Sequence, residues 1–137
     1  MISVNIWGVL LAALSCFIIG FMFHGPLFGK LWMRLANIHP TGNEKFSDMY
    51  GALAWNFISN VVAALVLSHL VKIMSLAHVM NGRIAIGVVA SLMLWAAVTA
   101  NSAMEPIWMG RKVPHWLFEV GTSLVCFIVM GIIVAVI

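Results

Sequence analysis

Residues 116–137 read WLFEVGTSLVCFIVMGIIVAVI, an apolar run with one charged side chain, Glu119. A helix rises about 1.5 Å per residue, so this run can cross the roughly 30 Å hydrocarbon core of a membrane. Three similar runs, at residues 2–23, 50–71 and 84–104, carry no charge at all. A soluble chain of this size could not bury four such helices. The sequence therefore predicts an all-α fold: a polytopic membrane four-helix bundle that forms one transmembrane domain over residues 1–137.

Composition and charge agree with a membrane protein. Of the 137 residues, 64% are hydrophobic and 8% are charged, with a net charge of +3. The basic residues lie between the runs, where the positive-inside rule places them, so their number does not indicate nucleic-acid binding. The first and third loops hold most of them: Lys30, Arg34, Lys45, Arg111 and Lys112. We expect these loops in the cytoplasm and both termini outside a plasma membrane.

The first loop contains a second kind of element. Over residues 28–36, apolar side chains fall on one helical face, and Lys30 and Arg34 form an i,i+4 pair on the other. This pattern is typical of a short helix that lies in the headgroup region. Further on, Thr41 and Glu44 have the spacing of a capping box, which favours a second helix that begins before the membrane.

Two similar segments follow the first and third runs. HGPLFGK at residues 24–30 and EPIWMGR at residues 105–111 both read as a polar residue, Pro, an aliphatic, an aromatic, Gly and a base. Two copies of a helical hairpin in the same orientation would produce this pattern, as in membrane proteins built from parallel repeats. The alternative is that such residues are simply common where spans end.

Polar residues gather toward the expected cytoplasmic side of the runs. One interpretation is a cytoplasm-facing polar pocket; the other is that these residues hydrogen-bond between packed helices. The candidate pocket residues are His24, Asn56, Asn60, Asn101, Glu105 and Glu119. A small residue at every fourth position of the first run predicts a close helix contact there. Those helix-packing residues are Gly8, Ala12, Cys16 and Gly20.

The two acids near the predicted interface are open to two interpretations. Glu119 follows His115 by four residues, which favours an interfacial ion pair, and the alternative is a carboxylate that handles protons or binds a cation. Of the histidines, only His24 and His69 fall in runs, at opposite ends, and His115 falls in a loop. With no HExxH motif or catalytic set of residues, we expect no metal, no cofactor and no enzymatic activity.

The stretch HGPLFGKLW at residues 24–32 resembles a conserved block of domain-of-unknown-function family 1761, and WMGRKVPHWLFEVGTSLV at residues 108–125 resembles its second block. The resemblance covers nearly the whole chain and implies a small bacterial four-span membrane protein, without an established activity. The family usually has Glu where Met109 stands, Tyr where Thr122 stands, and an aromatic-Ser pair in place of His24-Gly25. The matching motif residues are Pro26, Leu27, Phe28, Gly29, Lys30, Trp32, Gly110, Arg111 and Gly121.

Three classes of function remain open at this point. A non-enzymatic bundle that forms a homo-oligomer, or is an accessory subunit of a membrane complex, fits the small-residue stripes and short loops. A small oligomeric transporter fits the polar layer and the Pro-containing span ends. An enzyme acting on lipids or quinones would use His24 and Glu105 as acid and base. We favour the first class, and we expect the partners to be membrane lipids together with further copies of the chain or the other subunits of a membrane complex.

Overall fold

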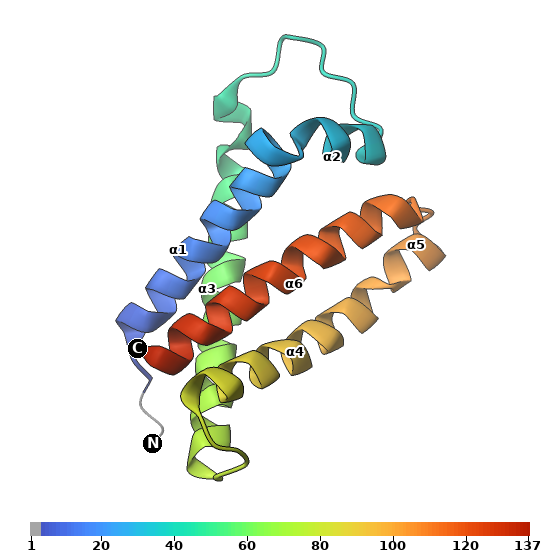
Figure 1. Ribbon diagram of the computed structural model, residues 1–137. Helices are drawn as coiled ribbons and strands as arrows, with labels where there is room; N and C mark the ends of the chain where they lie inside the picture. Colours follow the sequence, from blue (N-terminus) through green and yellow to red (C-terminus); the bar gives the residue numbers. More distant parts are fainter. Residues whose placement is uncertain (1–3) are drawn as a thin grey trace.

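The computed structural model describes residues 4–137 and is helical throughout that range apart from its connections (Figure 1). The elements in chain order are α1 (Ile6–Met22), the π-helix η1 (Phe23–Leu27), α2 (Gly29–Ala36), the 3-10 helix η2 (Phe46–Met49), α3 (Tyr50–Leu76), α4 (Arg83–Ser102), α5 (Met104–Trp108) and α6 (Val113–Val136). Four segments are long and apolar enough to cross a membrane: Ile6–Leu27, Phe46–Leu76, Arg83–Trp108 and Val113–Val136. The predicted four-span helical fold is confirmed.

The helix boundaries differ from the predicted ones in ways that the local chemistry explains. The first predicted run began at residue 2; residues 2 and 3 lie outside the described part, and α1 starts after Asn5, whose side chain accepts from the Trp7 N–H at 3.0 Å. Helix α6 starts at Val113, three residues before the predicted start of the run, because Pro114 is well tolerated in a first helical turn. The placement of His115 in a loop was therefore wrong, since it lies on α6.

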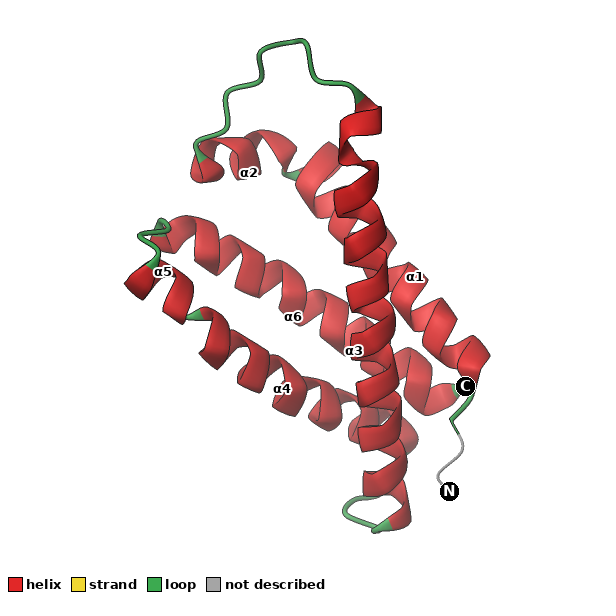
Figure 2. Ribbon diagram, turned by 180° about the vertical axis from the view of Figure 1, so that it is seen from behind, coloured by secondary structure: helices red, strands yellow, loops and turns green. Residues whose placement is uncertain are grey.

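The four spans converge at one side of the molecule and spread apart at the other (Figures 1 and 2). The two chain ends meet on the converging side, where the Asn5 amide donates to the carbonyl of Ile137 at 3.3 Å. We call this the terminal side. The opposite side carries α2 and α5, and there the ends of α3 and α5 lie well apart (Figure 2). We call it the α2 side.

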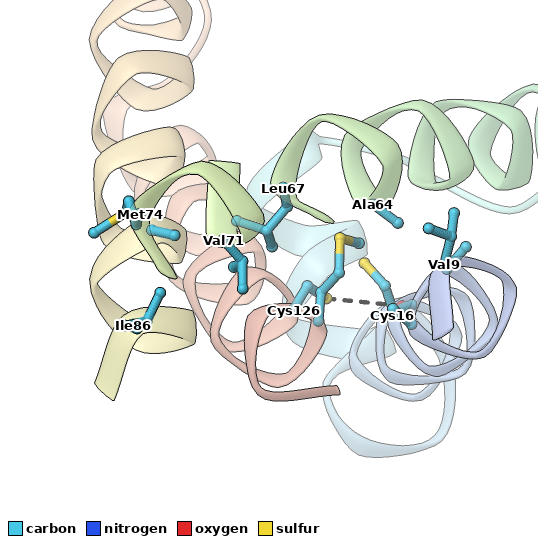
Figure 3. Close-up of a cluster of buried hydrophobic side chains, with 12 residues drawn as sticks. Val9, Cys16, Ala64, Leu67, Val71, Met74, Ile86 and Cys126 are labelled. Carbon is cyan, nitrogen blue, oxygen red and sulfur yellow. Dashed lines mark hydrogen bonds between the residues drawn. The ribbon is translucent and has the colours of Figure 1, made fainter. Parts of the chain in front are cut away.

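The buried core follows the same division. In α1 the buried residues extend only from Gly8 to Cys16, and in α3 only from Ala64 to Met74, so both sets lie toward the terminal side. Cys16 and Cys126 meet at the end of this core that is nearer the α2 side. There the Cys126 thiol lies 3.7 Å from the Cys16 carbonyl (Figure 3). The buried apolar residues are Val9, Ala12, Ala13, Cys16, Ala64, Leu67, Val71, Met74, Ile86, Ala90, Cys126 and Met130.

Helices α4 and α6 approach each other closely at two glycines. A Cβ added to Gly87 would collide with the carbonyl of Gly131, and would lie 2.8 Å from the Ala135 side chain. A Cβ added to Gly131 would collide with the Ser91 hydroxyl and the Gly87 carbonyl. In lipid, helices gain little from burying apolar surface, so this kind of small-residue contact stabilises their association.

The predicted stripe on α1 divides between packed and open positions. Gly8, Ala12 and Cys16 are buried, and a Cβ on Gly8 would sit in ordinary contact with Ile137 at 3.4 Å. Gly20 has no atom within 4 Å of where its Cβ would be. The stripe therefore contributes to packing in the terminal half of α1 and faces open space near the α2 side.

The two proline-containing segments end their spans differently. In the first, η1 carries Pro26 and the chain continues into α2, where a Cβ on Gly29 would come within 2.9 Å of the His24 carbonyl oxygen. In the second, α5 contains Pro106, and Gly110 adopts φ +66°, a left-handed conformation that favours glycine. Thus Gly29 permits close approach and Gly110 permits a turn. The hairpin repeat stays a prediction.

The capping-box pair organises a loop instead of starting a helix. Glu44 accepts from the Thr41 hydroxyl at 2.9 Å, from the Thr41 N–H at 2.6 Å and from the Gly42 N–H at 3.0 Å. These hydrogen bonds, first of all the one from the Thr41 backbone, lower the pKa of the Glu44 carboxyl to about 2. The helical chain resumes only at Phe46.

The contact between α4 and α6 yields the first testable prediction. Gly131→Ala should lower the free energy of unfolding by about 1–3 kcal/mol, because the added methyl has no room. Gly20→Ala, the matched control, should be neutral or stabilising by up to about 1 kcal/mol, since it gains helix propensity in open space. Unfolding in mixed micelles, followed by tryptophan fluorescence, measures both. Equal effects of the two variants would contradict a close contact at Gly131.

Candidate functional site

Glu119 is the centre of the main polar cluster on the α2 side. It lies six residues into α6, or about 9 Å along the helix from Val113, at a rise of 1.5 Å per residue. Its side chain is 38% exposed. A carboxylate at this depth in a membrane protein is costly unless it has partners. Three side chains from two other segments and from α6 itself supply them.

His24 approaches Glu119 from the π-helix η1. Its Nε2 lies 3.1 Å and 3.0 Å from the two carboxylate oxygens, and its Nδ1 lies 2.8 Å from the carbonyl of Gly20. The wider turn of a π-helix is a frequent feature of functional sites, and here it carries the histidine that faces α6. The ring of Phe118 packs edge-on against the His24 ring, with centroids 5.7 Å apart.

These two hydrogen bonds restrict where the protons are. A carbonyl oxygen can only accept, so the His24 Nδ1 must carry a hydrogen toward Gly20. One further proton then lies between His24 Nε2 and Glu119, either on the imidazole as an ion pair or on the carboxyl group as a neutral pair. The pair can hold one proton and pass it between two acceptors.

Trp32 is the second partner and ties α2 to α6. Its indole N–H donates to Glu119 Oε1 at 2.8 Å. The Trp32 ring also meets the His24 ring edge-on at 5.3 Å, so one aromatic side chain contacts both members of the pair. The short helix predicted over residues 28–36 is present as α2, and Trp32 and Glu119 join it to α6. Its place in the headgroup region stays a prediction.

His115 is the third partner, at the predicted i,i+4 spacing. Its Nε2 lies 3.5 Å from Glu119 Oε1, and its side chain is only 13% exposed. His115 is helical because α6 begins two residues before it. Residues four apart on a helix share a face, so His115 and Glu119 lie on the same side of α6. Glu119 is thus surrounded by nitrogen donors on three sides.

A cavity of about 550 Å³ opens beside this cluster. One wall is the apolar side of α2 and the residues after it, with Trp32, Leu35 and Ile38. The other wall is the connection between α5 and α6 and the first turns of α6, and Glu119 lines the cavity as well. Its size is within the range of small-molecule sites. The residues of the second wall are Gly110, Arg111, Lys112 and His115.

The six residues predicted to form one polar pocket are distributed over four places. His24 and Glu119 form the pair described above. Asn60 accepts from the Cys16 thiol at 3.3 Å between α1 and α3, and donates to Asn56 at 3.0 Å. Asn101 is exposed on α4. Glu105 pairs with Arg111 at 2.8 Å. The spreading of the spans on the α2 side separates these groups.

Sequence reasoning did not assign Trp32 to the cluster, although its surroundings held a signal. Trp32 is on the apolar face of the amphipathic segment, which also has to lie against a span. A half-buried indole N–H generally finds an acceptor. Glu119 is the one carboxylate of the C-terminal run, and it lies near the end of that run. Helical spacing alone could not connect two residues 87 positions apart.

Removing the Glu119 carboxylate should weaken the attachment of α2 to α6. We expect Glu119→Leu to speed amide hydrogen exchange across α2, because Trp32, His24 and His115 lose their shared acceptor. Hydrogen–deuterium exchange by mass spectrometry in detergent measures this. Trp32→Phe, which keeps the ring and loses the N–H, should give a smaller increase. Glu105→Leu is the matched control; an equal increase there would show that the effect is not specific to the cluster.

Within residues 4–137, no group of three or more His, Cys, Asp or Glu side chains is arranged to hold a metal ion. Comparison with known proteins gave one match to a family model, which covers residues 7–135 and is described as Protein of unknown function (DUF1761). No curated protein and no solved structure matches the chain. The model match spans nearly the whole sequence and all four membrane helices, so the chain belongs to the DUF1761 family.

Proposed function

We propose that this protein is a non-enzymatic helical bundle that works as a homo-oligomer in the membrane. The observation that carries the proposal is a groove on the α2 side, between the diverging helices α3 and α4. It has a volume of about 380 Å³ and is almost entirely apolar, apart from Ser59. The other lining residues are Trp55, Ile58, Val62, Ala63, Val66, Leu94, Val98 and Phe127.

Each wall of the groove continues into an exposed asparagine. On α3, Asn56 is three residues before Ser59 and seven before Ala63, which places the three on one helical face. On α4, Asn101 is three residues after Val98 and seven after Leu94, again on one face. Both asparagines are exposed, on a surface that a lone molecule would present to lipid.

A second copy is the partner that this arrangement favours. A side-chain amide is both donor and acceptor, so the same residue on two copies can pair across a two-fold axis. Hydrogen bonds of this kind stabilise helix association in membranes by about 0.6–2 kcal/mol each. The apolar groove between the asparagines offers room for a helix of the second copy to pack closely at Ala63.

We also propose a location and orientation. The five basic residues of the first and third loops all lie on the α2 side. The two others lie near the opposite end, Lys72 on α3 and Arg83 at the start of α4. The positive-inside rule then puts the α2 side in the cytoplasm of a bacterial cell and both termini outside the plasma membrane.

A second candidate function is a small transporter that couples to protons. The observation in its favour is the His24–Glu119 pair at the edge of the 550 Å³ cavity, whose imidazole and carboxylate can share one proton. In liposomes with an entrapped pH-sensitive dye, an imposed membrane potential should then drive proton entry. Entry should fall to the level of empty liposomes in Glu119→Gln and persist in Glu105→Gln. Wild-type entry equal to that of empty liposomes would contradict this function.

Self-association is tested by energy transfer between labelled copies in liposomes at a series of protein-to-lipid ratios. Asn56→Leu and Asn101→Leu should each weaken association roughly 3- to 20-fold, the equivalent of one lost interhelical hydrogen bond. Ala63→Leu should weaken it further, because the larger side chain fills the groove.

Ser15→Leu is the matched control, since its hydroxyl is bonded to the Leu11 carbonyl of its own helix at 2.8 Å and α1 does not line the groove. Thermal unfolding of every variant shows whether the bundle itself is intact. A wild-type protein that stays monomeric at all ratios would overturn the proposal, as would equal association of Asn56→Leu, Asn101→Leu and the control.

A further inference from the structure

The cavity beside Glu119 combines three properties that single out a class of ligand. It lies on the α2 side, between α2 and the start of α6. In the orientation proposed above, the ends of these helices lie near the cytoplasmic surface of the membrane, and the cavity opens there. It is separate from the α3–α4 groove, because the two share no lining residue. A ligand from the headgroup layer can therefore reach it without entering that groove.

The wall formed by α2 is apolar. Leu35 and Ala36 are half-buried there, and Ile38, just beyond the helix, is 42% exposed. The charged residues of α2, Lys30 and Arg34, are exposed and do not line the cavity. This wall suits the start of an acyl chain, which gains by leaving the polar surface for an apolar contact.

The opposite wall is basic. Arg111 is held in place by its ion pair with Glu105 at 2.8 Å, and both side chains remain more than a third exposed. Lys112 is exposed, lines the cavity and takes part in none of the ion pairs found within residues 4–137. A lysine ammonium group with no fixed partner is a strong binder of phosphate oxygens.

The acid in the cavity does not cancel this basic wall. Glu119 already accepts from Trp32 and lies against both His24 and His115, so its charge is met by donors on three sides. The net positive character of the opening is therefore set mainly by Lys112, because Glu105 offsets part of the charge of Arg111.

We infer that this cavity binds the headgroup of an anionic phospholipid, with its phosphate on Lys112 and Arg111 and the first part of an acyl chain against Leu35 and Ile38. Basic pockets between membrane helices on the side that faces the cytoplasm are recurrent sites for such headgroups. The same lipid would contact α2 and α6 together, at the place where Trp32 and Glu119 already join them.

Native mass spectrometry tests this with the full chain, released from a detergent into which phosphatidylglycerol or phosphatidylcholine of equal chain length is titrated. We expect phosphatidylglycerol to be retained, one per chain, at several-fold lower concentration than phosphatidylcholine. Lys112→Gln should weaken that retention roughly fivefold, the usual effect of one basic residue at a membrane surface. Ile38→Gln, at an exposed position that should not disturb folding, should also weaken it.

Lys30→Gln is the matched control, since Lys30 is a lysine of the same membrane side that does not line the cavity. Equal losses for Lys30→Gln and Lys112→Gln would mean general attraction to the basic surface and would overturn the site. Equal retention of the two lipids would overturn it as well. Displacement of phosphatidylglycerol by soluble glycerol 3-phosphate, with no effect of Ile38→Gln, would show a free phosphate compound as the ligand and overturn the lipid assignment.

Discussion

The contact on which the bundle depends is the close approach of α4 and α6 at Gly87 and Gly131. In water, four apolar helices would associate simply to leave the solvent, but lipid tails are as apolar as the helices. What holds them together is close packing of backbones and small side chains. The absence of a Cβ at these two glycines lets each backbone touch the other, and Ser91 fits into the space that remains.

Most of the small residues that are buried in the spans lie in the terminal half, so the packing is one-sided. Ala12, Ala64 and Ala90 are fully buried there, each on a different helix. Toward the α2 side the spans carry larger residues such as Trp55, Ile58 and Leu94, which prevent close approach and leave a groove. The spans are thus closest where small side chains are buried between them.

The open side is also where the polar chemistry lies, and the two facts are connected. Glu119 needs donors because it sits on a membrane span, and only an uncrowded end of the bundle leaves room for His24, Trp32 and His115 to reach it. The π-helix and α2 fold back over α6 to bring two of these donors. The resulting cluster holds α2 against α6 and borders a cavity with one basic and one apolar wall. The separate groove between α3 and α4 carries the proposed contact with a second copy.

The sequence by itself determined the number of spans, the short helix after the first span and the pairing of His115 with Glu119, because these depend on run length and on helical periodicity within one segment. It also carried the family resemblance in the blocks at residues 24–32 and 108–125, which the family match over residues 7–135 confirms. Only the tertiary structure decided that His24 and Trp32 meet Glu119 while Asn56, Asn101 and Glu105 do not, and that Gly87 and Gly131 form the tight contact. Spacing within a helix says which residues share a face, but which faces meet depends on how closely two helices can approach, and that is set by side chains far apart in the chain.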